Sequence, residues 1–367
     1  MTYLDYQATT PLAPEARAAM RPWLEDGGFA NPHSPHRMGR AAAAAVEVAR
    51  DQVAALMPPG GRVIFTSGAT EAINLAILGR ARVGALSRIA VSAIEHAAVL
   101  ETAAASGAVV DVLPVSPAGL VAADAPIAAG TDLVAVMQVN NEIGTIQPVA
   151  ALAEQAHAAG ALMLVDAVQG AGKIAAPGTG FGGADMIALS AHKIYGPKGI
   201  GALWLRDGVA LAPILHGGGQ EQGLRSGTLS PALCAGFGAA AALCGKLWQS
   251  DAEHVDRLWK RARGALPGWV LNGDDGARWR GNLNLRRAGL DVARLMSDLR
   301  DIAFSAGSAC ASGSGRPSHV LAALGLSAAE AKASVRIGFG RYTGEEELAR
   351  ALARIDAAAR AQGDLAW

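Results

Sequence analysis

The lysine at position 193 stands in the most chemically suggestive segment of this 367-residue chain. The segment reads Ser-Ala-His-Lys-Ile-Tyr-Gly-Pro-Lys-Gly from Ser190 to Gly199, and apolar runs typical of strands precede and follow it. Taken alone, a lysine in such a loop is more often a solvated charge. The alternative is a lysine whose partly desolvated amine condenses with the aldehyde of a cofactor. The other polar clusters of the chain decide between these two interpretations.

Polar side chains follow a series of apolar runs, each at the point where a predicted strand ends. The runs are 89–92, 132–139, 161–165 and 186–189, and the polar residues after them are His96, Asn141, Asp166, Gln169, His192 and Lys193. Near-continuous apolar strands that alternate with helices, such as 148–159, predict a sheet buried on both faces. Because ligands of such sheets bind beyond the carboxyl ends of the strands, we expect these side chains to converge.

An anion-binding turn is predicted near position 70. An apolar strand at 62–66 runs into Ser67-Gly-Ala-Thr70, and a helix is predicted from Glu71 to Leu78. Backbone N–H groups and the helix dipole make such an N-terminus a cradle for phosphate. An ordinary helix cap would use the same donors, so the two interpretations are compatible.

This set of residues meets the chemical requirements of pyridoxal phosphate. The aldehyde needs a lysine, and the pyridine nitrogen needs a carboxylate such as Asp166 to stay protonated and act as an electron sink. An imidazole such as His96 can lie on the ring or move protons. A single aspartate at a strand end more often caps a helix. Together with Lys193 and the cradle, however, Asp166 predicts a cofactor site.

Composition and cysteine usage exclude several other classes of protein. The formal net charge is zero and only 17% of the residues are charged, so neither a nucleic acid nor an anionic membrane is a predicted partner. The cysteines, Cys234, Cys244 and Cys310, form no Cys-x-x-Cys pair, which argues against a metal or dithiol site. Their odd number, without a signal peptide, predicts a cytoplasmic protein. The apolar stretch 229–243 is short for a membrane span and predicts a buried helix.

Cys310 is the cysteine with a predicted chemical role. It lies in a run of small residues, 305–315, that is unsuited to a core, whereas Cys234 and Cys244 lie on an alanine-rich helix and are predicted to be buried. A thiol on an exposed, mobile loop suits a sulfur acceptor, because the thiolate must enter the site and then leave with the sulfur.

Long motifs occur in one order over nearly the whole chain. Besides 190–199 they are Leu4-Asp-Tyr-Gln-Ala-Thr-Thr-Pro11, Phe65-Thr-Ser-Gly-Ala-Thr-Glu71, Val139-Asn-Asn-Glu-Ile-Gly144, Val165-Asp-Ala-Val-Gln169, His216-Gly-Gly-Gly-Gln-Glu-Gln-Gly-Leu-Arg-Ser-Gly-Thr228 and Ser305-Ala-Gly-Ser-Ala-Cys310. The combination resembles the cysteine desulfurases of the class V pyridoxal-phosphate aminotransferase family, of the housekeeping and nitrogen-fixation type. The spacing from Cys310 to Pro317-Ser-His-Val320 is similar to that of the long-loop subgroup.

The resemblance implies an α/β fold of the type I pyridoxal-phosphate transferases. Its large domain would hold a mostly parallel seven-stranded sheet sandwiched by helices, and a smaller α+β domain would be attached to it. The expected bounds are 14–250 for the large, cofactor-binding domain. Residues 1–13 and 251–367 would form the small domain, which carries the cysteine loop.

The resemblance also implies a role for each site residue. Lys193 would carry the cofactor, Asp166 would face the pyridine nitrogen, and His96 would stack on the ring. Ala69, Thr70, Ser190 and His192 would contact the phosphate. Asn141 and Gln169 would contact the phenolic oxygen of the cofactor or the substrate. Thr228 would reach the phosphate of a neighbouring subunit, which implies a homodimer. Arg336 would pair with the substrate carboxylate, a task that suits a bidentate guanidinium, with help from Asn31.

The implied reaction removes sulfur from L-cysteine and gives L-alanine. Lys193 would act as base on the Cα proton, and the Cys310 thiolate would take the sulfur as a persulfide. The persulfide would then pass sulfur to an iron–sulfur scaffold or another acceptor protein. Housekeeping members carry a longer tail that helps dock the scaffold, whereas this sequence stops at Trp367, so the resemblance leaves open whether the scaffold docks in the same way.

Other functions remain open at this stage. A selenocysteine lyase or a small-amino-acid transaminase would share the family motifs, although Cys310 disfavours the transaminase. A non-catalytic scaffold of the same fold would tend to lose Lys193 or Cys310, and both are present. The string Gly178-Thr-Gly-Phe-Gly-Gly183 fits a dinucleotide-binding pattern but precedes a predicted strand instead of following one. Val168 and Gln220 depart from the family pattern at peripheral positions.

Overall fold

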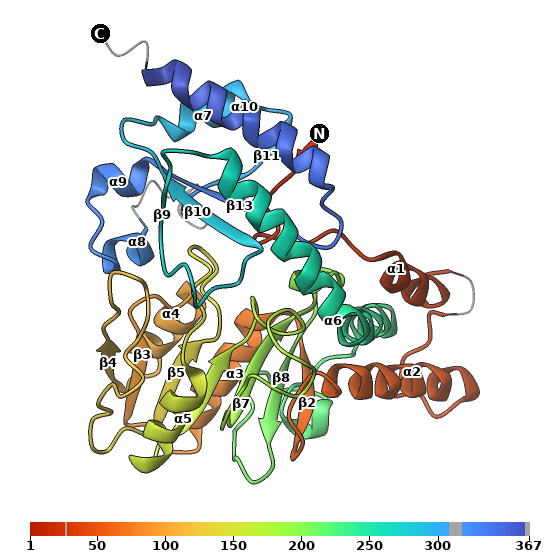
Figure 1. Ribbon diagram of the computed structural model, residues 1–367. Coiled ribbons are helices and arrows are strands. Elements are labelled where there is room, and N and C mark those ends of the chain that lie inside the picture. Colours follow the sequence, from red (N-terminus) through yellow and green to blue (C-terminus); the bar gives the residue numbers. More distant parts are fainter. Residues whose placement is uncertain (26–27, 308–317, 364–367) are drawn as a thin grey trace.

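The computed structural model describes residues 1–25, 28–307 and 318–363, so Cys310 lies outside the described residues. Figure 1 shows the strands surrounded by helices. The strands are β1 (Thr2–Tyr3), β2 (Gly61–Thr66), β3 (Arg88–Ser92), β4 (Val109–Leu113), β5 (Leu133–Met137), β6 (Leu162–Asp166), β7 (Met186–Ser190), β8 (Gly201–Arg206), β9 (Val270–Leu271), β10 (Asn282–Arg286), β11 (Ile302–Ala303), β12 (Ser305–Ala306) and β13 (Ser334–Gly338). The helices are α1 (Pro14–Met20), α2 (Arg37–Ala54), α3 (Ala69–Arg82), α4 (Ala97–Ala105), α5 (Val149–Ala158), α6 (Pro231–Ala265), α7 (Val292–Asp298), α8 (His319–Ala323), α9 (Ala328–Lys332) and α10 (Glu345–Gly363), with 3-10 turns at Arg21–Trp23, Ala191–Lys193 and Glu221–Gly223.

The larger sheet has seven strands in the order β2-β8-β7-β6-β5-β3-β4. Strand β8 pairs antiparallel with both β2 and β7, and the other pairings are parallel. The predicted mostly parallel sheet is therefore confirmed. The loop from Gly178 to Gly183 leads into β7, as the sequence indicated, and opens no helix.

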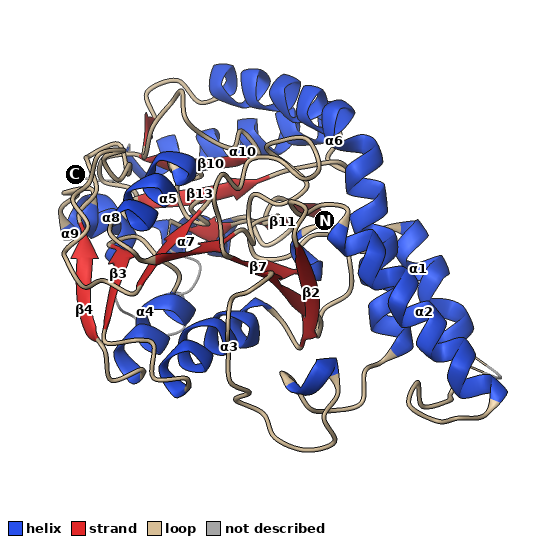
Figure 2. Ribbon diagram, turned by 90° about the horizontal axis from the view of Figure 1, so that it is seen from below, coloured by secondary structure: helices blue, strands red, loops and turns tan. Residues whose placement is uncertain are grey.

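Helices cover both faces of this sheet, as its apolar strands require. On β2, Val63 and Phe65 belong to a core formed with α2, α5 and α6, while Ile64 between them belongs to a second core formed with α3 and α4. The same alternation on β8 sends Trp204 to the first core and Leu203 to the second. Figure 2 shows α3 and α4 on one side of the strands and α5 on the other.

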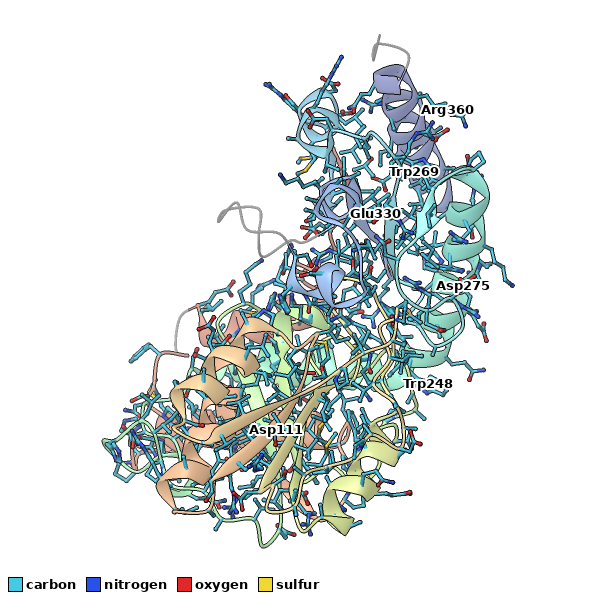
Figure 3. The ribbon with its side chains drawn as sticks, turned by 90° about the vertical axis from the view of Figure 1, so that its left-hand side faces the viewer. Asp111, Trp248, Trp269, Asp275, Glu330 and Arg360 are labelled. Atoms are coloured by element: carbon cyan, nitrogen blue, oxygen red, sulfur yellow. The ribbon has the colours of Figure 1, made fainter. Side chains whose placement is uncertain are left out.

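A second, four-stranded sheet forms the upper part of the molecule in Figure 1, with the order β12-β13-β10-β9 and antiparallel pairings. It packs with α7 and α10 around its own apolar core, which includes Val335, Ile337 and Leu352. The predicted second unit therefore contains both strands and helices. Figure 3 shows Asp111 in the lower part of the molecule and Trp269 and Glu330 in the upper part.

Helix α6 connects the two parts. Its first half, with Cys234 and Phe237, belongs to the core of the large sheet, and its second half, with Leu258 and Trp259, belongs to the core of the small sheet. The proposed domain boundary at residue 250 falls inside this continuous helix and remains a proposal. By length and composition alone α6 could cross a membrane, but both halves carry buried core side chains.

Residues 5–10, which include a turn at 6–8, run between the two parts, and we call this segment the N-terminal strap. Before it, β1 pairs in parallel with β11, and the Leu4 carbonyl accepts the Gly338 N–H on β13 at 2.7 Å. At its other end, the Thr10 N–H donates to the His192 carbonyl at 2.9 Å. The strap thus ties the small sheet to the loop that contains Lys193.

Candidate active site

A cavity of about 490 Å³ lies at the carboxyl ends of β5, β6 and β7. This volume is within the usual range for small-molecule sites. Its wall brings together most of the residues that the sequence singled out: Ala69, Thr70, His96, Asn141, Asp166, Gln169, Ser190, His192, Lys193 and Arg336. The convergence follows from the topology, because parallel strands present the residues after their carboxyl ends at one edge of the sheet.

Lys193 ends the short 3-10 turn after β7 and points toward the N-terminal strap. Its Nζ donates hydrogen bonds to the carbonyl oxygens of Gln7 and Ala8, at 2.5 and 2.8 Å. The side chain is half-buried and lines the cavity. The amine is therefore held at the cavity wall, which excludes the interpretation as a solvated loop charge.

Tyr195 fixes the loop that carries Lys193. Its φ of 68° is in the left-handed region, which is costly for a residue with an aromatic side chain. The buried ring compensates through its contacts: the Arg341 guanidinium lies over it at 4.2 Å, and Tyr342 packs edge-on with ring centroids 5.4 Å apart. The Tyr195 N–H also donates to the Thr10 hydroxyl of the strap at 2.8 Å. Together these contacts hold the backbone at Tyr195 in its left-handed conformation, two residues after Lys193.

Asp166 is the last residue of β6 and is only 6% exposed. Its Oδ1 accepts the Val168 N–H at 3.0 Å. Burial raises the pKa of Asp166, and the hydrogen bond from Val168 and the charges of His96 and Lys193 counteract that effect only in part. A cationic partner would stabilise the ionised form of this buried carboxyl. A protonated pyridine nitrogen in the cavity would be such a partner.

Two imidazoles at the site are neutral near pH 7. Burial lowers the pKa of His96, whose Nδ1 accepts the Ala98 N–H at 3.1 Å and so caps α4. Burial and the neighbouring lysines, first among them Lys193, lower the pKa of His192 to about 4. Both rings therefore carry one N–H donor and no full charge, which suits stacking and hydrogen bonding rather than ion pairing.

Gln169 is buried three residues after the end of β6 and contacts the strap. Its Nε2 donates to the Gln7 carbonyl at 2.9 Å, which leaves one of its two hydrogens for an oxygen in the cavity. The predicted contact with a phenolic oxygen is compatible with this arrangement.

The phosphate cradle forms where β2 runs into α3. Ser67, Gly68, Ala69 and Thr70 line the cavity, and α3 begins at Ala69, so its first N–H groups face the site. The start of β8 packs closely against the cradle. This packing requires the glycine at position 201, because a Cβ there would lie 2.6 Å from the Gly68 carbonyl carbon. The cradle is therefore pre-formed by the packing of β8.

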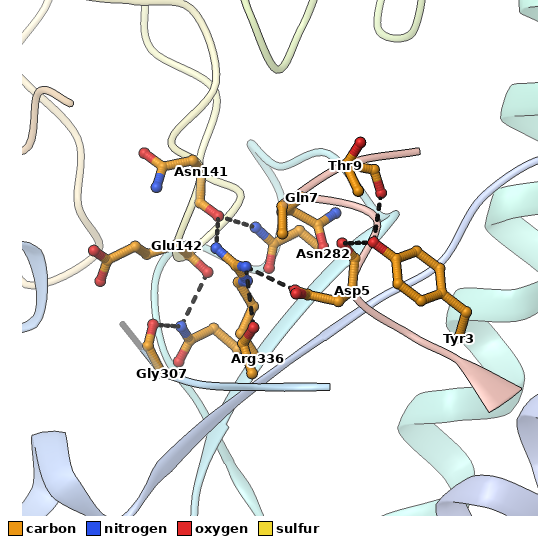
Figure 4. A network of polar contacts seen from close by, with 12 residues as sticks. Tyr3, Asp5, Gln7, Thr9, Asn141, Glu142, Asn282, Gly307 and Arg336 are labelled. Carbon is orange, nitrogen blue, oxygen red and sulfur yellow. Dashed lines mark hydrogen bonds and ion pairs between the residues drawn. The ribbon is translucent and has the colours of Figure 1, made fainter. Parts of the chain in front are cut away.

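Arg336 comes from β13 of the small sheet and is only 1% exposed. Figure 4 shows its guanidinium between Asp5 and Asn141: Nη2 donates to Asp5 Oδ1 at 2.8 Å, and Nη1 donates to the Asn141 carbonyl at 3.0 Å. Its buried Nε has no hydrogen-bond partner within the described part of the chain. An oriented guanidinium in the cavity wall is suited to a carboxylate.

Three residues predicted for the site are placed elsewhere or not described. Asn31 is exposed and accepts the His33 N–H through Oδ1 at 2.8 Å, and Thr228 is also exposed; neither lines the cavity. Cys310 lies outside the described residues. The roles of all three stay predictions.

The cavity wall also includes residues that were not among those predicted for the site, such as Lys198 and, in the strap, Gln7 and Ala8, which contact Lys193. The sequence signal that could have identified the strap is the motif Leu4–Pro11, which is one of the long motifs that carry the resemblance to the family.

The residues present fit pyridoxal phosphate. A lysine amine, a buried carboxyl and an anion cradle surround one cavity of suitable volume. Lys193 would hold the aldehyde, Asp166 the pyridine nitrogen, and Ala69, Thr70, Ser190 and His192 the phosphate. Within residues 1–25, 28–307 and 318–363, no group of three or more His, Cys, Asp or Glu side chains could hold a metal ion.

This chain is similar to known proteins in both sequence and structure. The sequence pattern of the Aminotransferase class-V family matches residues 2–351. A cysteine desulfurase IscS from Rickettsia felis (strain ATCC VR-1525 / URRWXCal2) is 41% identical over 362 residues, which cover 94% of this chain and 88% of that protein. The solved structure of a NifS-like protein aligns with a TM-score of 0.88 at 31% identity and covers 97% of this chain and 98% of that one. A structure of SspA in complex with cysteine aligns with a TM-score of 0.81 at 35% identity, over 94% of this chain and 100% of that one. The chain therefore belongs to the class V aminotransferase family, whose cofactor is pyridoxal phosphate.

Proposed function

We propose that this chain is a cysteine desulfurase that converts L-cysteine to L-alanine and retains the sulfur as a persulfide on Cys310. The observation that carries the proposal is the cavity in which Lys193, Asp166, the phosphate cradle and Arg336 meet. Two similar proteins support the choice of substrate: the Rickettsia felis relative is named a cysteine desulfurase, and SspA was solved with cysteine.

Each residue then has a task at a stated atom. When bound, the cofactor supplies an electron sink for the Cα–H bond of the substrate. Asp166 keeps a proton at the pyridine nitrogen, and Arg336 binds the substrate carboxylate from the small sheet. Lys193 takes the Cα proton through Nζ, and the carbonyls of Gln7 and Ala8 hold this amine in reach. Neutral His96 covers the ring and can donate or accept a proton through Nε2.

The sulfur step uses Cys310. Its thiolate attacks the substrate Sγ and the bond from Sγ to Cβ breaks, so one sulfur atom passes from substrate to enzyme. The electron pair of that bond remains with the substrate carbon skeleton, which takes up protons and leaves as alanine. No external oxidant or reductant is required, because cysteine plus a thiol gives alanine plus a persulfide.

The proposal extends to partners and location. A homodimer would let Thr228 reach the phosphate in the neighbouring subunit, and its exposure in the single chain suits that role. An iron–sulfur scaffold or another sulfur-acceptor protein would take the persulfide sulfur. We place the protein in the cytoplasm, where the free thiols Cys234 and Cys244 stay reduced.

A product assay tests the proposal directly. The purified protein, incubated with L-cysteine, pyridoxal phosphate and a reducing thiol but no keto acid, should release alanine and sulfide in equal amounts. Alanine formation that depends on a keto acid would instead indicate a transaminase. A specificity constant far higher for selenocysteine than for cysteine would indicate a selenocysteine lyase.

Replacing Arg336 with lysine should raise the KM for L-cysteine by about 10- to 100-fold and change kcat much less. Lysine keeps the positive charge but cannot bind a carboxylate in bidentate fashion while also reaching Asp5 and the Asn141 carbonyl. Steady-state kinetics measure the effect. Arg286→Lys, on the neighbouring strand β10, is the matched control and should leave the KM unchanged. An unaltered KM in Arg336→Lys would remove Arg336 from substrate binding.

Replacing Asp166 with asparagine should lower kcat by about 10²- to 10³-fold. The amide keeps the volume and can still accept the Val168 N–H, but it lacks the charge that keeps the pyridine nitrogen protonated. Stopped-flow absorbance of the bound cofactor, together with kcat, reports the loss. Asp132→Asn makes the same chemical change beside Ser87, before β5 at the opposite end of the sheet, and should leave kcat within about twofold of wild type. Equal losses in the two variants would contradict the assigned role.

A further inference from the structure

A partly buried ion pair joins the phosphate cradle to the loop between β8 and α6. Arg225 Nε donates to Glu71 Oε1 at 2.8 Å, and its Nη2 lies 3.3 Å from Oε2. The two side chains are only 16% and 12% exposed. Glu71 Oε2 also accepts the N–H of Ser67, the first cradle residue, at 2.7 Å. The carboxylate therefore sits directly behind the backbone that is proposed to bind phosphate.

Glu71 carries a full negative charge in this position. Burial opposes its ionisation, but the hydrogen bonds from Arg225 and Ser67 lower its pKa overall. The Glu71 carboxylate lies in the first turn of α3, where the helix dipole stabilises a negative charge. The cofactor phosphate would be stabilised by the same positive end of the dipole. A second anion this close would repel the phosphate unless a cation compensates its charge.

We propose that Arg225 is a positioning residue for the cofactor phosphate: by pairing with Glu71 it cancels the charge behind the cradle, so that Ser67 to Thr70 accept a phosphate dianion. The inference rests on the proposed placement of the phosphate at this cradle. It assigns no contact between Arg225 and the cofactor.

Other hydrogen bonds also hold the loop that carries Arg225. Replacing the Arg225 side chain therefore tests the effect of its charge and not the effect of a disordered loop. Arg50 donates to both carboxylate oxygens of Glu221 at 2.7 and 2.8 Å, and Glu221 also accepts the Phe65 N–H at 2.7 Å. Closer to β8, the Ala212 N–H donates to the Gly79 carbonyl at the far end of α3. These contacts do not involve the ion pair between Glu71 and Arg225.

The test compares two cofactor forms that differ only in the phosphate. The full-length chain, stripped of cofactor, is titrated with pyridoxal phosphate and with pyridoxal, and binding is followed by visible absorbance. In Arg225→Gln the dissociation constant for pyridoxal phosphate should rise about 10- to 100-fold, while that for pyridoxal stays unchanged. The double variant Glu71→Gln with Arg225→Gln should return to within about threefold of wild type, because the uncompensated carboxylate is gone.

Two further variants make the result independent of folding defects. Glu71→Gln alone keeps an acceptor for the Ser67 N–H and leaves Arg225 as a net positive charge, so pyridoxal phosphate should bind at least as tightly as in wild type. Arg88, at the start of β3 and away from the cradle, donates through Nη1 to both carboxylate oxygens of Asp111, and Arg88→Gln should not affect either dissociation constant.

Several outcomes would overturn the inference while leaving the proposed function intact. They are an unchanged affinity in Arg225→Gln, an equal loss for pyridoxal, or a double variant as weak as Arg225→Gln. The last result would mean that Arg225 itself contacts the phosphate or orders the loop. A wild-type chain that binds neither compound would instead contradict the proposed function itself.

Discussion

Replacing Lys193 with alanine is expected to lower kcat for L-cysteine by about 10⁴-fold or more and to abolish covalent attachment of the cofactor. The loss is large because one amine holds the aldehyde and then moves the Cα proton. The structure places Nζ at the cavity wall, hydrogen-bonded to the Gln7 and Ala8 carbonyls. Borohydride reduction followed by peptide mass analysis should find the label on residue 193 of the wild type and nowhere in the variant.

Two control variants separate chemistry from charge and packing. Lys198→Ala removes a second lysine that lines the same cavity, and it should retain borohydride labelling and most of kcat. Lys193→Arg keeps donors for the strap carbonyls but cannot lose a proton near neutral pH, so it should be as inactive as the alanine variant. A Lys193→Ala protein that still carries borohydride-stable cofactor at another lysine would show that the site is assigned to the wrong residue.

The core of the site could be predicted because its residues follow buried strands. The strands β6 (Leu162–Asp166) and β7 (Met186–Ser190) lie within one residue of the apolar runs in the sequence. A strand buried on both faces must be apolar to its end, so the first polar residue marks the carboxyl edge of the sheet. That rule identifies Asp166 at the end of β6 and Ser190 at the end of β7, three residues before Lys193, and parallel pairing of β6 with β7 brings Asp166 and Lys193 to one edge.

The N-terminal strap could not be predicted in the same way. Its contacts with Lys193 and Gln169 use the backbone carbonyl groups of Gln7 and Ala8, which any residue would supply. The contact between Gln7 and Lys193 also spans 186 positions in the sequence, and no local periodicity reports such a distance. The pairing of Glu71 with Arg225 is hidden for the same reason, across 154 positions.

The predicted roles of Asn31 and Thr228 are not accounted for by contacts within the single chain. Both side chains are exposed and lie away from the cavity wall of their own subunit. In the proposed homodimer Thr228 would make its functional contact across an interface, so neither the strand pattern nor the contacts within one chain reveal it. Only the long motif 216–228, through its resemblance to the family, points to Thr228.

Replacing Cys310 with serine is expected to abolish persulfide formation and to lower alanine production by about 10³-fold or more. A serine hydroxyl stays protonated near neutral pH and is a poor nucleophile toward sulfur, so the substrate Sγ has no acceptor. Cys310 lies outside the described residues, but described residues before and after its segment contact Arg336, which lines the cavity, and Glu95, the neighbour of His96. Ser305 pairs with Arg336 in the small sheet, and the His319 ring contacts the Glu95 carbonyl at 2.9 Å, next to His96.

The other two cysteines supply the control for this experiment. Cys234 is fully buried and its pKa is raised to about 12, chiefly by burial, while burial also raises the pKa of Cys244. Neither thiol forms a thiolate near neutral pH, so Cys234→Ala should keep full persulfide formation after reaction with radiolabelled cysteine. Cys310→Ser should still bind pyridoxal phosphate and change its absorbance when cysteine is added, because Lys193, Asp166 and Arg336 are intact. If Cys310→Ser formed alanine at the wild-type rate, sulfur transfer would have to use another acceptor, and the reaction would be a cysteine lyase without an enzyme persulfide.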